Sequence, residues 1–69
     1  MKTALMYGAS DMFVTMRDNS YALTTYKDEA LDFGKPVNGL YDTICAVDDT
    51  LSRKLTGYKR GLLKVMEIN

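Results

Sequence analysis

A stripe of apolar residues between positions 37 and 55 limits the folds open to this chain more than any other feature. Its members recur three or four positions apart, so they fall on one side of an α-helix, which repeats about every 3.6 residues. The stripe contains Val37, Leu40, Tyr41, Ile44, Val47, Leu51 and Leu55. Asn38 suits the capping position before such a helix, and Gly57 suits a left-handed residue after it. The sequence therefore predicts an amphipathic helix over about residues 38–56, whose apolar side must be covered by other elements.

Residues 12–17 and 20–26 have the composition and the alternation of two β-strands. Between them lies Asp18-Asn19, and both residue types tolerate the left-handed backbone of a tight hairpin turn. With these two residues as the loop, Met16 faces Tyr21 and Val14 faces Leu23. The apolar face of this hairpin (12–26) then consists of Met12, Val14, Met16, Tyr21 and Leu23. The outer face consists of Phe13, Thr15, Arg17, Thr24 and Tyr26.

Three flanking segments complete the predicted fold. Residues 2–7 suit a first strand, and residues 28–36 suit a short helical turn or a structured loop that a glycine and a proline bring to an end. Residues 62–68 are apolar on both faces, which fits a central or well-covered last strand. A second helix is the alternative there, because leucine, lysine, methionine and glutamate favour helices. The prediction is one α+β domain over residues 1–69, in the order β-β-β-α-β, with one helix laid across a small antiparallel sheet.

A chain of 69 residues can support only one small core, since a domain of this size buries about 60% of the surface of its unfolded chain. Its composition, 46% hydrophobic and 26% charged, is that of an ordinary globular domain. We expect the helix to pack on the apolar face of the hairpin. The residues expected to be buried are Val14, Leu23, Leu40, Ile44, Val47, Leu51, Leu55, Leu63 and Val65.

No apolar run approaches the roughly 20 residues that cross a bilayer, so a membrane is not an expected partner. Asp11 interrupts the modest apolar stretch near the amino terminus, and a signal peptide is not expected either. Cys45 is the single cysteine, which rules out an internal disulfide bond and fits a reducing compartment. The expected localisation is cytoplasmic.

The residue types that carry most enzyme chemistry are missing or badly placed. Histidine is absent, which removes the commonest general base and the commonest transition-metal ligand. Cys45 adjoins Ile44 in the predicted helix, and we expect it to be buried and structural. The acidic groups Asp48-Asp49 and Asp28-Glu29 with Asp32 lack the ligand pattern of a calcium loop, so solvated surface is the better interpretation. No catalytic residue, cofactor, metal or small-molecule substrate is expected.

The 5 methionines and 5 tyrosines allow two interpretations. Methionine is common at adaptable binding surfaces, and tyrosine is common in binding hot spots. Both types also fill irregular cores and half-buried sheet faces, and for Met12 and Met16 the core is the preferred interpretation.

Charge is distributed unevenly although the formal net charge is +0. Residues 1–50 hold four basic and eight acidic groups (4 − 8 = −4), whereas residues 51–69 hold five basic groups and one acidic group (5 − 1 = +4). A candidate partner-binding basic patch follows from this asymmetry: Arg53, Lys54, Tyr58, Lys59, Arg60 and Lys64. Such a patch suits an acidic protein surface or, as the alternative, a phosphate backbone; a pI near 6.1 makes nucleic acid the less favoured partner.

Elimination leaves a small non-catalytic protein-binding module as the expected function. It would regulate or inhibit a larger protein partner by occupying a surface of it, as small phage-encoded host-interaction and anti-defence proteins do; this is an analogy of size, and no motif supports it. A small nucleic-acid-binding protein that uses the basic carboxyl-terminal third is the alternative. We also expect a homodimer or a tight hetero-complex formed through the edge of the 12–26 hairpin or the neighbouring first strand.

Overall fold

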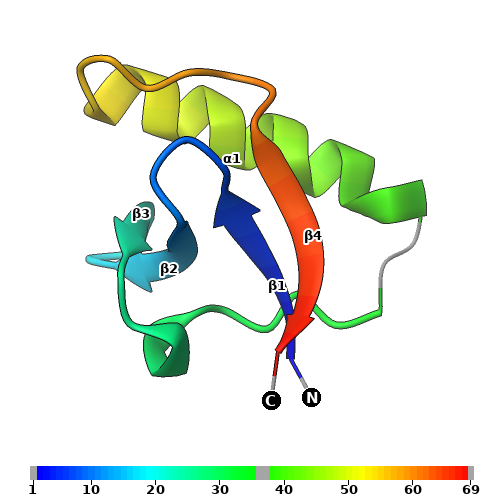
Figure 1. The fold of residues 1–69 in the computed structure, drawn as a ribbon. Coiled ribbons are helices and arrows are strands. Elements are labelled where there is room, and N and C mark those ends of the chain that lie inside the picture. The colour runs from blue at the N-terminus through cyan, green and yellow to red at the C-terminus, as the bar shows by residue number, and fades with distance from the viewer. Residues whose placement is uncertain (1, 36–37, 69) are drawn as a thin grey trace.

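The computed structural model describes residues 2–35 and 38–68 and confirms the predicted α+β fold (Figure 1). The predicted roles of Pro36 as a stop signal and of Val37 in the helical stripe lie outside the described residues. The elements are β1 (Lys2–Tyr7), β2 (Met12–Arg17), β3 (Ser20–Thr24), a 3-10 turn (Lys27–Glu29), a second 3-10 turn (Asn38–Leu40), α1 (Tyr41–Lys54) and β4 (Leu63–Ile68). None of the helices among these residues has the length and the hydropathy needed to cross a membrane.

The β2–β3 hairpin forms as the sequence predicts. Asp18 and Asn19 take left-handed backbone angles, with φ of 51° and 61°, which match the twist of the flanking strands. The register places Met16 opposite Tyr21 and pairs position 14 with position 23. The local signals of the turn and of the alternation therefore determine both the loop and the register.

The four strands form one antiparallel sheet in the order β3-β2-β1-β4. The segment 62–68 is a strand, as predicted, and it pairs with β1 from Lys2↔Ile68 to Tyr7↔Leu63. The sequence predicted a central or well-covered strand, and the central position is wrong, because β4 forms an edge of the sheet and β1 lies inside it. Both faces of β4 are apolar because each face packs on a different cluster. Leu63 and Val65 pack in the main core beside α1, whereas Met66 and Ile68 pack in a second cluster on the opposite face.

The pairing of β1 with β2 is short, and another segment fills the gap between the two strands. The register runs only through Met6↔Phe13 and Tyr7↔Met12. Beyond it, Leu31 donates its backbone N–H to the Val14 carbonyl (3.0 Å) and Phe33 donates to the Thr3 carbonyl (2.8 Å). We call residues 27–33 the strap. It occupies the hydrogen-bonding groups that the diverging strands leave open.

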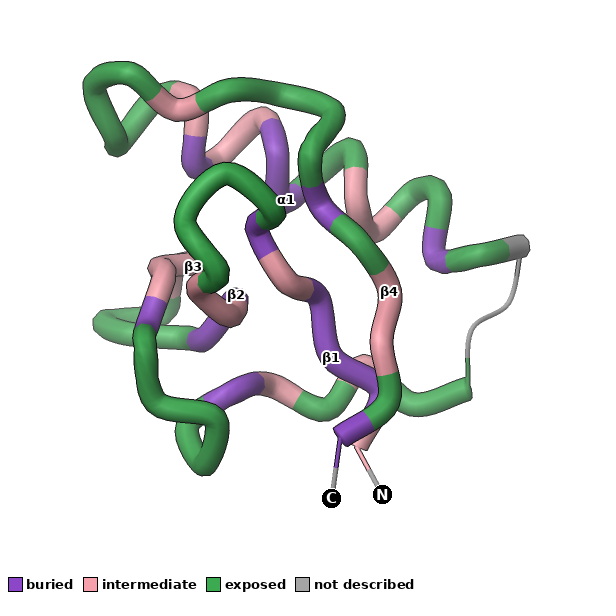
Figure 2. Tube along the Cα trace, in the orientation of Figure 1, coloured by how far each residue is buried: buried purple, intermediate pink, exposed green. Residues whose placement is uncertain are grey.

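The main core lies between the sheet and α1, where the purple segments of Figure 2 face one another. Of the predicted core residues, Val14, Leu40, Val47, Leu51 and Leu63 are buried, and Leu23, Ile44 and Val65 are half-buried against them. Leu55 was predicted to be buried and is 38% exposed. The helix ends at Lys54, and Leu55 takes an extended backbone (φ −114°, ψ 118°), so its side chain leaves the helical stripe.

Two further expectations about the helix are wrong. The helix begins later than predicted: its cap position is Leu40, in a left-handed conformation with φ of 60°, and not position 38. Cys45 is exposed rather than buried. It lies two positions before the buried Val47, and this places it about 200° away around the helix, on the solvent side. Gly57 has φ of 84°, the left-handed conformation that the sequence predicts.

Candidate binding pocket

The loop from α1 to β4 is held in place by two tyrosines and a carboxylate. Tyr58 stacks on Tyr7 of β1, with ring centroids 4.6 Å apart and an interplanar angle of 16°. The Tyr58 hydroxyl donates a hydrogen bond to Asp48 of α1, and the Gly61 backbone N–H donates to the same carboxylate at 3.1 Å. The Tyr7 hydroxyl accepts a bond from the Lys59 backbone N–H at 2.8 Å. These contacts tie the loop to both layers of the fold.

Asp48 is only 7% exposed, so the interpretation of Asp48-Asp49 as solvated surface is wrong for this residue. A signal for its burial was present in the sequence, because position 48 lies four after Ile44 and three before Leu51, on the apolar stripe itself. Burial of Tyr58, followed by its hydrogen bond to Asp48, raises the pKa of the Tyr58 hydroxyl above its ordinary value. The hydroxyl therefore stays protonated and serves as a donor.

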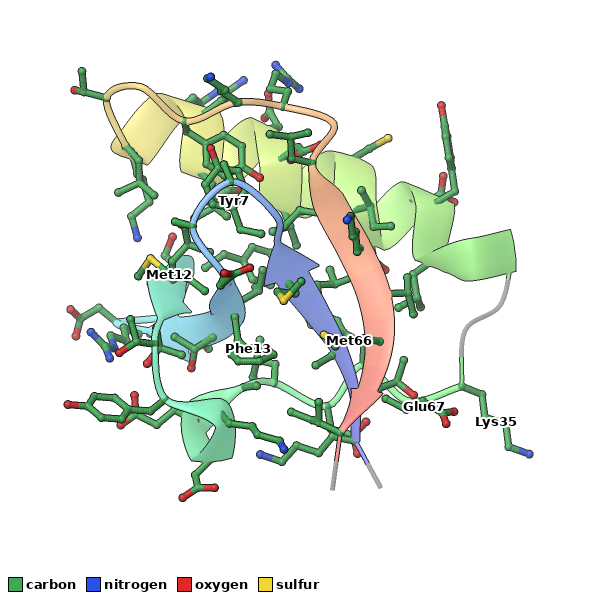
Figure 3. All side chains as sticks on the ribbon, viewed as in Figure 1. Tyr7, Met12, Phe13, Lys35, Met66 and Glu67 are labelled. Atoms are coloured by element: carbon green, nitrogen blue, oxygen red, sulfur yellow. The ribbon has the colours of Figure 1, made fainter. Side chains whose placement is uncertain are left out.

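An apolar pocket of about 390 Å³ lies beside this loop. One wall comes from the hairpin, one from the carboxyl-terminal end of α1, and one from the start of the loop. The lining residues are Tyr7, Met12, Ala22, Leu23, Leu51, Lys54, Leu55, Thr56, Gly57 and Tyr58. Tyr7 and Met12 are labelled on this side of the molecule in Figure 3. The exposure of Leu55 follows from this position, since its side chain borders the pocket instead of the core.

Among the described residues, Lys54 provides the only charged side chain of the lining. Its Nζ donates to the Tyr21 carbonyl oxygen at 2.8 Å and lies 3.4 Å from the Ser20 hydroxyl oxygen. These bonds draw the end of the helix onto β3 and hold a positive charge at the rim of an otherwise apolar hollow. The side chain remains exposed.

The predicted basic patch is divided by the fold into groups with different surroundings. Arg53 and Arg60 both approach Asp49, at 3.2 and 3.7 Å, and Arg53 lies one helical turn after Asp49. Tyr58 is half-buried within the loop. Lys59 and Lys64 are exposed, and their side chains form no hydrogen bond or ion pair with the residues that the structure describes.

The outer face of the hairpin is not an open surface. Thr15 and Thr24 were expected there as exposed residues and are 6% and 3% exposed, because the strap covers them. The Thr15 hydroxyl donates to the Glu29 carbonyl oxygen (2.7 Å), and the Thr24 hydroxyl donates to the Glu29 carboxylate (2.9 Å). The Thr24 hydrogen bond, followed by the bond from Arg17, lowers the pKa of Glu29.

The other outer-face residues differ in exposure. Phe13 is half-buried against the cluster that contains Ala4 and Ala30, whereas Arg17 and Tyr26 are exposed. The Arg17 guanidinium lies 3.0 Å from the Glu29 carboxylate. The strap therefore takes up most of the face that the sequence left open to a partner.

The candidate site on the described surface is thus an apolar pocket with Lys54 at its rim. Within residues 2–35 and 38–68, no group of three or more aspartate, glutamate or cysteine side chains is arranged to hold a metal ion. Comparisons with protein-family models, with curated proteins and with solved structures found no match for this chain.

Proposed function

We propose that this chain is a non-catalytic protein-binding module that regulates or inhibits a larger protein by occupying part of its surface. The observation that carries the proposal is the apolar pocket between the hairpin and the end of α1. Its volume of about 390 Å³ falls in the range of pockets that hold a ligand group. Tyrosine, methionine and leucine form its walls, and a single lysine stands at its rim, which suits one apolar anchor residue of a protein partner.

The charge at the rim favours a particular kind of anchor. Lys54 keeps its ammonium group at the edge of the pocket, and Lys59 is exposed in the adjoining loop. An apolar side chain that is followed or preceded by an acidic residue would fill the hollow and meet these cations. Complementary charge would mainly accelerate association, since exposed pairs add little to affinity.

The side chains around the pocket support binding rather than catalysis. The two phenolic hydroxyls in the lining, those of Tyr7 and Tyr58, already take part in bonds to the Lys59 backbone and to Asp48. The raised pKa of Tyr58 makes it a poor general base. The nucleic-acid alternative has weak support, because Arg53 and Arg60 are paired with Asp49 instead of being free for phosphates.

The test compares two exposed leucines of the same loop. Leu55 lines the pocket and is 38% exposed, whereas Leu62 lies outside the lining and is 37% exposed. The parent chain, Leu55→Asp and Leu62→Asp are used as baits in a cell lysate, and the captured proteins are quantified by mass spectrometry. The partner is expected to be a protein that the parent and Leu62→Asp retain and Leu55→Asp loses.

Calorimetry with that purified protein should then show affinity at least about tenfold weaker for Leu55→Asp than for the parent. Equal capture by both variants would contradict a role of the pocket. Capture of nucleic acid that declines steeply with added salt would favour the alternative function.

A further inference from the structure

The two edges of the sheet, β3 and β4, differ in how their outward backbone groups are occupied. At the β3 edge, the Lys54 ammonium occupies the Tyr21 carbonyl oxygen, and a charged side chain there discourages a further strand. The β4 edge extends over Leu63–Ile68, a full-length strand that contains neither proline nor glycine. In Figure 1 this strand lies at the front of the molecule, with β1 on one side only.

Hydrogen-bonded and non-hydrogen-bonded residue pairs alternate along β1 and β4, and this alternation shows which backbone groups of β4 face solvent. Gly8 donates its backbone N–H to the Leu62 carbonyl at 2.9 Å, so the even-numbered residues of β4 are the ones that exchange bonds with β1. The backbone N–H and C=O groups of Leu63, Val65 and Glu67 therefore point away from the sheet. Within the described part of the chain, these groups have no hydrogen-bond partner.

We propose that β4 pairs antiparallel with β4 of a second copy of this chain, so that two four-stranded sheets become one continuous sheet across a two-fold axis. One register satisfies all three outward residues, with Val65 opposite Val65 and Leu63 opposite Glu67. A shift of two residues in one direction would place Glu67 opposite Gly61, which lies outside β4 and whose N–H is bonded to Asp48. A shift in the other direction would carry the partner of Leu63 beyond the described residues. A second copy thus offers the matching set of donors and acceptors.

Charge agrees with self-pairing in this register. The chain has a formal net charge of +0, so two copies do not repel each other as wholes. Lys64 lies opposite Met66 of the second copy, and Glu67 lies opposite Leu63, so no like charges face each other. The 64–66 pairs are of the type without direct hydrogen bonds, in which side chains approach most closely. Dimerisation would also add buried surface to a domain too small to bury much alone.

The first experiment removes one edge donor. Glu67 is exposed, and its N–H points outward, so Glu67→Pro deletes an intermolecular bond while leaving the ladder with β1 complete. Glu67→Ala is the matched control, because it removes the same side chain and keeps the N–H. Sedimentation equilibrium over a concentration series should show a dimer for the parent and for Glu67→Ala, and a dissociation constant raised about tenfold or more for Glu67→Pro.

The second experiment tests the register through charge. Met66→Lys would oppose Lys64 of the second copy and should weaken the dimer, whereas Met66→Glu would pair with it and should strengthen it, each by about two- to tenfold. The double variant Lys64→Glu/Met66→Lys should restore dimerisation. A parent chain that sediments as a strict monomer would overturn the proposal, and so would a dimer that ignores all of these substitutions. If Glu67→Pro weakened the dimer but the charge substitutions had no effect, the register with Val65 opposite Val65 would be wrong.

Discussion

At the scale of single residues, Asp48 holds the loop that forms part of the pocket wall. A carboxylate in a nearly dry site is costly unless donors replace its lost water, and Asp48 has two, the Tyr58 hydroxyl and the Gly61 backbone N–H. Through Tyr58, which stacks on Tyr7, this one side chain connects α1 to the loop and the loop to the sheet. The pocket wall therefore depends on a residue that does not itself line the pocket.

Tyr58→Phe should lower the free energy of unfolding by about 1–3 kcal/mol, because it leaves a buried carboxylate with one donor fewer. Urea denaturation at neutral pH measures the change. Tyr26→Phe is the control, since Tyr26 is 66% exposed and should be neutral within about 0.5 kcal/mol. Equal effects of the two substitutions would contradict the role given to the Asp48 bond.

The raised pKa of Tyr58 predicts a loss of stability at alkaline pH. An unfolded tyrosine ionises near pH ~10, whereas burial and the bond to Asp48 keep the folded Tyr58 hydroxyl protonated above that pH. The unfolded state then releases a proton that the folded state retains, so the free energy of unfolding falls as pH rises above about 10. Tyr58→Phe should show a shallower decline over this range than Tyr26→Phe. Identical pH profiles of the two variants would contradict the shift.

The exposure of Cys45 makes a simple chemical prediction. A thiol reagent should label the native protein rapidly and completely, because the side chain lies on the solvent side of α1. Cys45→Ser should change the free energy of unfolding by no more than about 0.5 kcal/mol. Labelling that occurs only in denaturant would show that the helix is rotated from the orientation described.

At the scale of elements, the sequence predicts those whose signals are local. The spacing of Ile44, Val47 and Leu51 predicts α1, and Asp18-Asn19 predicts the hairpin turn together with its register. A short helical turn or structured loop was predicted over residues 28–36, and the 3-10 turn Lys27–Glu29 agrees with it. The strap's bonds to Val14 and Thr3 could not be predicted, since they join backbone groups far apart in the sequence and depend on no residue type. The edge position of β4 was likewise hidden, because apolar residues on both faces also suit a central strand.

The candidate site was predictable only in part, for the same reason. The basic residues were identified from composition. Of their partners, local spacing can reveal Asp49 for Arg53, one helical turn apart, but not the contacts made across the fold. The pocket arises where the hairpin and the end of α1 fail to meet completely, and such a gap depends on tertiary packing. Leu55 lines it because the helix stops at Lys54, one residue before the apolar stripe does.

The strap should loosen when the Thr24 hydroxyl is removed. This group donates to the Glu29 carboxylate and accepts from the Tyr26 backbone N–H at 3.1 Å, and valine keeps its shape without either bond. Thr24→Val should cost about 1 kcal/mol and accelerate hydrogen exchange at the Leu31 amide, which bonds to β2. Thr25→Val is the control, because it makes the same chemical change at the next residue, which is exposed and lies just outside β3. Slow exchange in both variants would mean that the strap does not depend on this bond.

At the scale of the whole molecule, one core holds the two layers together. Leu5 and Val14 from the sheet and Val47 and Leu51 from α1 are the largest fully buried side chains of the described residues, and all four belong to one cluster. A smaller cluster on the opposite face has only three buried members among the described residues, Ala4, Ala30 and Ile68. Because folded domains are stable by only about 5–15 kcal/mol, with small ones near the lower end, a single cavity in the main cluster should affect the entire fold.

Leu51→Ala is the decisive substitution at this scale. Leu51 has 0% exposure, and its truncation should cost about 2–5 kcal/mol through lost burial and the cavity left behind. Each kcal/mol lowers the melting temperature of so small a domain by roughly 4–8 °C, so the variant should be largely unfolded well below the parent's transition. Leu55→Ala removes the same atoms from a side chain that is 38% exposed and lies beyond the end of α1, and it should shift the transition far less. Thermal denaturation followed by circular dichroism compares the two, and equal shifts would show that the helix continues past Lys54 and that Leu55 belongs to the core.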